Sequence, residues 1–106
     1  IHGGEIETSM MLHLAPATVH MEEARDWRST SQDRAAAHAI LGNGRSAKMG
    51  WAIEDYHPAG AVGNAAAATA AKGQAVVQAA GQALAHLLSE LHALPLSTLG
   101  TPAQPR

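Results

Sequence analysis

The chain has 106 residues, and its seven Lys and Arg against nine Asp and Glu give a formal net charge of −2. This length limits it to one domain with a modest core, and the charge balance offers no basic face for nucleic acid. It has no cysteine, which excludes disulfides and thiolate metal sites, and no apolar run of the length that a membrane span needs. We therefore expect a cytoplasmic protein.

The first residues concentrate the polar chemistry. His2, the glycine pair 3–4 and the acids Glu5 and Glu7 directly precede an apolar run. The glycines allow a close backbone approach, and acids in the first turn of a helix are favoured by the helix dipole. Two interpretations are open at this point: an ordinary helix start, or a site in which His2 acts with Glu5 or Glu7.

Residues 5–14 are predicted to form a short helix. Ile6, Met10 and Leu14 recur at four-residue intervals on one stripe, and Pro16 discourages continuation. Met10 and its neighbour Met11 are better interpreted as core filler than as soft metal ligands. The helix would hold the preceding histidine in place.

The middle of the chain carries less signal. Residues 17–27 are predicted to form a short strand or helix, whose opposite charges neutralise one another in solvent. Residues 33–41 predict a turn or two of helix, ended by Gly42-Asn43-Gly44. We expect His13, His20 and His38 to be solvated.

Residues 47–57 show the alternation of a strand with one buried face, formed by Met49, Trp51 and Ile53. We expect a strand or an extended active-site segment. Asp55 and His57 then stand in a loop before Pro58 and could hold a metal or order the loop by hydrogen bonds.

From Asn64 onward the chain is rich in alanine. We predict that residues 66–92 form the longest helix, capped by Asn64 or Thr69. Its apolar stripe would pack on a sheet or a partner chain through Val77, Leu84, Leu88 and Leu91. Two glycines inside this helix, Gly73 and Gly81, suggest close packing against another element. A frayed tail is expected after the helix ends at Pro95.

Two motifs resemble one protein family. Residues 2–9, His-Gly-Gly-Glu-Ile-Glu-Thr-Ser, resemble the His-(Ala/Gly)-Gly-x-x-Glu-Thr-Ser block in the C-terminal part of the creatininase (creatinine amidohydrolase) family. Residues 60–63 and 68–73 resemble the Gly-rich turn and the Ala-Thr-Ala-Glu-Lys-Gly helix start of the family, in the same order. Ala71 stands where that second motif has an acid.

The resemblance implies an α/β fold, in which residues 1–94 are the C-terminal portion of a three-layer α/β/α domain and residues 95–106 a flexible tail. It implies hydrolysis of a non-peptide C–N bond in a small cyclic or linear amide, often by homo-oligomers that use divalent Zn, Mn or Fe. His2 matches the family's catalytic histidine, which would pass a proton to the departing nitrogen, and Glu7 would orient His2 or a neighbouring backbone group. The family's metal ligands precede this block and are not matched here.

Because the strongest motif begins at the second residue, we expect the chain to be a fragment that is inactive by itself. The alternative is a non-catalytic helical interaction module derived from such an enzyme. In that case the Ala-rich helix docks on a partner, and residues 2–12 are only a helix start.

Overall fold

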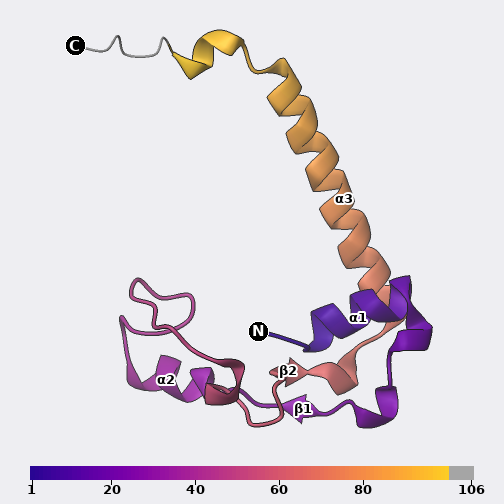
Figure 1. Cartoon of the computed structure of the whole chain (residues 1–106), viewed down its shortest axis with the longest axis vertical. Coiled ribbons are helices and arrows are strands. Elements are labelled where there is room, and N and C mark those ends of the chain that lie inside the picture. The colour runs from indigo at the N-terminus through magenta and orange to yellow at the C-terminus, as the bar shows by residue number, and fades with distance from the viewer. Residues whose placement is uncertain (101–106) are drawn as a thin grey trace.

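A computed structural model describes residues 1–100 of the chain. Its helices and strands are α1 (Glu5–Leu14), β1 (Asp26–Trp27), α2 (Ser31–Ala37), β2 (Gly63–Asn64) and α3 (Ala70–Ala93). Short 3-10 turns lie between them, at Pro16–Thr18, Met21–Glu23, Ile53–Asp55, Ala65–Ala67 and Leu96–Leu99. This mixture of helices with a small two-stranded sheet is compatible with the expected α/β class (Figure 1).

Helix α1 has the predicted bounds. Its first turn contains two acids, as expected, and Glu7 reaches back to accept a hydrogen bond from the backbone N–H of Gly3. This contact satisfies a backbone donor just before the helix begins. The helix ends at Leu14, because Pro16 opens the following 3-10 turn.

The crossing of α1 over the start of α3 is the main helix–helix contact. Ser9 is fully buried, and its hydroxyl accepts a hydrogen bond of 3.1 Å from the backbone N–H of Thr69. Thr69 in turn caps α3, since its side chain accepts from the N–H of Lys72 at 3.2 Å. A Cβ added at Gly73 would lie 1.8 Å from the carbonyl oxygen of Ser9. The predicted close packing at Gly73 is therefore confirmed.

The other predicted glycine contact is wrong. A Cβ at Gly81 would meet nothing within 4 Å, because α3 has already left the body of the protein at that turn. The apolar stripe of α1 is not covered within residues 1–100, since Ile6 and Leu14 are 62% and 61% exposed and the buried position of the helix is Ser9. Ser9 is buried because the start of α3 crosses directly over its backbone at Gly73.

A small sheet and an isolated bridge hold the two halves of the chain together. Strands β1 and β2 are antiparallel, with Asp26 opposite Asn64 and Trp27 opposite Gly63. One residue earlier, Val62 forms an antiparallel bridge with His2. The small apolar core gathers beside these pairs and consists of Tyr56, Val62, Ala65 and Ala68.

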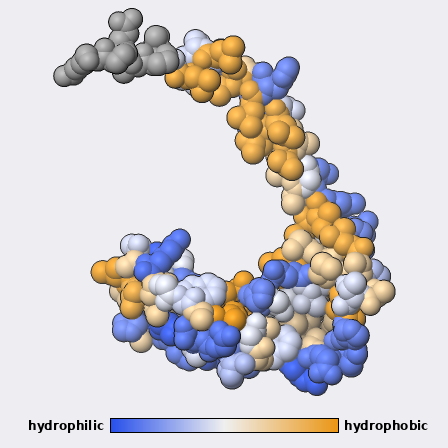
Figure 2. All heavy atoms as spheres, in the orientation of Figure 1, coloured by the Kyte–Doolittle hydropathy of each residue, from blue (hydrophilic) through white to orange (hydrophobic). Residues whose placement is uncertain are grey.

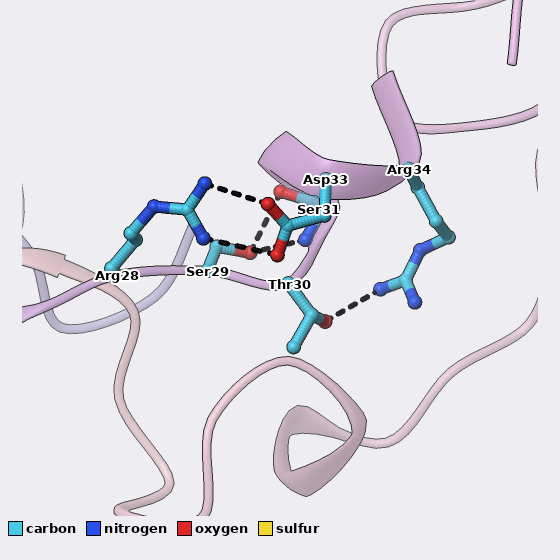
Figure 3. Close-up of polar contacts among 6 residues, drawn as sticks. All are labelled: Arg28, Ser29, Thr30, Ser31, Asp33 and Arg34. Atoms are coloured by element: carbon cyan, nitrogen blue, oxygen red, sulfur yellow. Dashed lines mark hydrogen bonds and ion pairs between the residues drawn. The ribbon is translucent and has the colours of Figure 1, made fainter. Parts of the chain in front are cut away.

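Helix α2 is fixed by polar contacts at its start (Figure 3). Arg28 donates to both carboxylate oxygens of Asp33, at 3.0 and 2.7 Å. The Thr30 hydroxyl accepts from Arg34 at 2.9 Å and donates to the backbone carbonyl of Asp55 at 2.8 Å. These bonds join α2 to the 3-10 turn at Ile53–Asp55, which lies beside the buried Tyr56.

The strand predicted at residues 47–57 is wrong. This segment is an irregular loop followed by the 3-10 turn, and both Met49 and Trp51 are exposed. A strand needs a neighbour for its backbone groups, and within residues 1–100 the only ladder is that of β1 with β2. Trp51 instead packs edge-on against Tyr56, with ring centroids 4.6 Å apart.

The predicted longest helix is confirmed as α3, which starts four residues later than expected. Thr69 caps it, whereas Asn64 caps the 3-10 turn before it. Beyond its first turns α3 projects from the body of the chain, and its distal part carries apolar surface (Figures 1 and 2). Leu84 and Leu88 are 56% and 57% exposed, so the predicted packing on a sheet does not occur within residues 1–100.

Two smaller expectations need correction. Arg25 does not neutralise a nearby acid but donates to the backbone carbonyls of Glu22 and Ala24. The segment expected to be a frayed tail contains a 3-10 turn at Leu96–Leu99, and the rest of the tail, residues 101–106, lies outside the described residues. His13, His20 and His38 are exposed, as expected.

Candidate functional site

The backbone of His2 is held by the bridge to Val62. The N–H of Val62 donates to the carbonyl of His2 at 2.7 Å, and the N–H of His2 donates back at 3.4 Å. Val62 is only 1% exposed, so this anchor belongs to the core. The imidazole itself is 62% exposed and lies free to meet a ligand.

Glu7 faces this histidine from the first turn of α1. Its Oε2 lies 3.7 Å from Nδ1 of His2, which is the distance of an ion pair when the imidazole is protonated. The same oxygen accepts from the N–H of Gly3, which fixes its direction. Gly3 has φ of +65°, and an added Cβ would lie 3.3 Å from the side chain of Ala61, so glycine suits the turn that brings the pair together.

Glu5 points to a different partner. Its Oε1 lies 2.5 Å from Nζ of Lys72, which also donates to the carbonyl of Ala67 at 2.7 Å. The two acids of this turn therefore have different partners: Glu7 faces His2, and Glu5 joins α1 to the start of α3.

The His2 and Glu7 pair lies at a cleft of about 370 Å³. This size is within the range of small-molecule sites. The far wall comes from residues 18–24 and from β1. Its lining includes His2, Gly3, Glu7, Thr8, Met11, Thr18, Val19, His20, Met21, Glu23, Ala24, Trp27, Ala61 and Ala65.

Sequence reasoning missed the far wall of the cleft, including its side chains His20, Met21, Glu23 and Trp27. His20 was expected only as a solvated residue. No spacing rule joins these positions to His2, because the turn at Pro16 and the pairing of β1 with β2 bring them there.

Comparison with known protein families identifies the family of this chain. A model of the family described as Creatininase, creatinine amidohydrolase, matches residues 1–88. The chain belongs to the creatininase family. Comparisons with curated proteins and with solved structures gave no match. The match covers both motifs that resemble creatininases and ends within α3.

A creatininase is expected to hold metal, but the described residues do not fit a metal centre. Within residues 1–100 no three His, Asp, Glu or Cys side chains converge as a ligand set. Asp55 accepts from the N–H of Ala52 at 2.8 Å, and Nδ1 of His57 accepts from the N–H of Ala59 at 3.1 Å. Of the two open interpretations, these bonds favour ordering of the loop.

Charge interactions beside the cleft separate two adjacent acids. His20 lies 3.1 Å from Glu22, and a backbone hydrogen bond at Glu22 together with this imidazole lowers the pKa of the Glu22 carboxyl. Glu23 lines the cleft instead, and none of the ion pairs found within residues 1–100 involves it.

No helix in this part of the chain is long and apolar enough to cross a membrane.

Proposed function

We propose that this chain is the C-terminal part of a metal-dependent amidohydrolase domain with a three-layer α/β/α fold. The domain hydrolyses a non-peptide C–N bond of a small cyclic or linear amide. The observation that carries the proposal is the His2 and Glu7 pair, 3.7 Å apart at the edge of a cleft, in a chain whose residues 1–88 match the creatininase family.

The chemistry assigned to this chain is proton transfer. His2 acts as the general acid. Its exposed imidazole lies at the cleft, where it passes a proton to the nitrogen that leaves the amide. Glu7 positions that imidazole, with its Oε2 3.7 Å from Nδ1 of His2. The hydrogen bond from Gly3 keeps the carboxylate directed at the histidine. Such a general acid typically contributes about 10²- to 10⁴-fold to a rate.

The metals that the family implies, Zn, Mn or Fe, would take their ligands from a part of the protein that these residues do not include. Exposed apolar surface supports this arrangement. Ile6 and Leu14 on α1 and the leucines of α3 lie open, and exposed apolar patches on this scale mark a surface that another element covers. The missing layers of the domain would pack there.

A second candidate function follows from the same surface. If α3 docks on a partner protein and the cleft has no substrate, the chain is a non-catalytic helical interaction module. The projecting apolar part of α3 favours this alternative (Figure 2). Turnover and its dependence on the histidine distinguish the two. The first proposal also includes that the amidohydrolase is cytoplasmic and forms a homo-oligomer.

The test uses a longer protein that contains this segment. His2→Ala should lower amide turnover by about 10²-fold or more and leave bound metal in place. The matched control is His38→Ala, because His38 is exposed and does not line the cleft. Loss of metal in His2→Ala would make His2 a ligand, and unchanged turnover would contradict its role as the proton donor.

A further inference from the structure

The cleft beside His2 has a distinctive charge pattern. Its ionisable lining residues are His2, Glu7, His20 and Glu23, and among residues 1–100 no lysine or arginine lines it. With neutral imidazoles the cleft therefore carries two negative charges and no fixed positive one. A field of this kind attracts cations and repels anions.

Glu23 is the acid that is free to act on a ligand. Glu7 is already engaged by Gly3 and faces His2. Glu22, its neighbour, is paired with His20 and does not line the cleft. Both carboxylates belong to the 3-10 turn Met21–Glu23, but only Glu23 lines the cleft.

Trp27 gives the cleft a rigid apolar wall. Its backbone is held opposite Gly63 in the ladder of β1 with β2, and its half-buried side chain lines the cleft. Met11 from α1 and Met21 from the 3-10 turn complete this wall. A tryptophan fixed by a strand is a preorganised surface, and methionines adapt to the ligand shape.

We propose that Glu23 and Trp27 determine which amides the cleft accepts. Glu23 excludes anionic amides, and Trp27 binds the apolar part of an uncharged or cationic one. This inference rests on the proposed function, because it takes the cleft at His2 as the substrate site. It adds two selectivity residues that do not take part in the proton transfer.

The test measures binding by the full 106-residue chain, without turnover. Trp51→Phe leaves Trp27 as the only tryptophan, so its fluorescence reports the cleft directly. The probes are three five-membered lactams: neutral 2-pyrrolidinone, cationic 3-amino-2-pyrrolidinone and anionic 5-oxoproline. For ligands this small, dissociation constants of roughly millimolar are expected.

The anionic lactam should bind roughly tenfold more weakly than the neutral one at low salt, because it meets two carboxylates at close range. Glu23→Gln should reduce this difference to about two- to threefold, and 0.5 M NaCl should also reduce it. The matched control Glu22→Gln removes the same charge one residue away and should leave the difference unchanged. Met21→Ala should weaken binding of all three lactams.

Three results would overturn the inference. Equal binding of anionic and neutral lactams would show that no charge selection exists. An equal effect of Glu22→Gln and Glu23→Gln would show that the discrimination against the anionic lactam comes from general surface charge and not from Glu23. No response of Trp27 to any lactam at tens of millimolar, with a folded circular dichroism spectrum, would show that it is not a binding wall.

Failure of this inference can be told apart from failure of the proposed function. If the longer protein hydrolyses an amide in a His2-dependent way but ignores Glu23→Gln, the selectivity assignment is wrong and the function stands. If the chain discriminates lactams by charge but the longer protein shows no turnover, the cleft binds ligands without hydrolysing them.

Discussion

Gly73→Ala tests the contact that positions the candidate site. Gly73 lies in the first turn of α3, directly over the backbone of α1. An added methyl carbon would lie 1.8 Å from the carbonyl oxygen of Ser9, 2.4 Å from its carbonyl carbon and 2.8 Å from the nitrogen of Met10. All three atoms belong to the backbone, so no change of side-chain rotamer can relieve the overlap.

The size of the effect follows from these distances. To reach ordinary contact the two helices must separate by about 1.5 Å. Overpacking of this kind costs about 1 to 3 kcal/mol or more. The separation also strains the 3.1 Å hydrogen bond from Thr69 to Ser9, which contributes about 1 kcal/mol. Alanine returns about 1 kcal/mol in helix propensity, so we expect a net loss of about 1 to 3 kcal/mol.

The assay is urea unfolding of the 106-residue chain, followed by circular dichroism. Gly81→Ala is the matched control, because it makes the same substitution in the same helix with nothing within 4 Å of the new methyl group. The control should stabilise α3 by about 1 kcal/mol. If Gly73→Ala proves as stable as the wild type, or moves in the same direction as Gly81→Ala, the close crossing of α1 and α3 is wrong.

Three further predictions follow from exposure and charge. Leu84→Ala should change the stability of the 106-residue chain by about 0.5 kcal/mol or less, but cost about 2 to 5 kcal/mol in thermal melts of a longer protein that covers α3. The hydrogen bonds from Arg28 lower the pKa of Asp33, so Arg28→Gln should raise this pKa in a carboxyl NMR titration. The pair's small contribution to stability is present above about pH 4 and is lost as the pH falls through the lowered pKa. The purified 106-residue chain should neither bind two metals by elemental analysis nor hydrolyse amides when metal is added, because residues 1–100 contain no converging ligand set.

The elements that sequence could predict are those set by local interactions. Helix α1 was predicted to the residue, because its acids, its glycine pair and Pro16 are all neighbours in the chain. Thr69, one of the two caps predicted for the long helix, does cap α3, although the helix begins at Ala70 and not at residue 66. Gly73 and Gly81 show the limit of this reasoning. They look alike in sequence, and only the tertiary path of α1 makes the first a contact and the second an open position.

The strand predicted at residues 47–57 failed for a related reason. Alternation of Met49, Trp51 and Ile53 indicates a half-buried strand only where a second strand lies alongside. Within residues 1–100 the segment makes only an isolated bridge, between Ala47 and Leu41, and Trp51 packs on Tyr56 from a loop. The apolar stripe of α1 is not covered within residues 1–100 because the neighbouring helix approaches on the side of Ser9 and not on the side of Ile6.

The candidate site likewise has one part that local sequence determines and one part that depends on the tertiary structure. His2 and Glu7 are five residues apart, so a helix start with a preceding turn brings them together, and the rest of the fold contributes only the bridge that holds His2 to Val62. The far wall depends on pairing of β1 with β2, residues almost forty positions apart, and on a single 3-10 turn. In sequence Glu22 and Glu23 are equivalent acids, yet the turn gives one to His20 and the other to the cleft. Ligand selectivity is therefore the property least accessible to sequence, and comparison of the two glutamine variants measures how much of it this one turn creates.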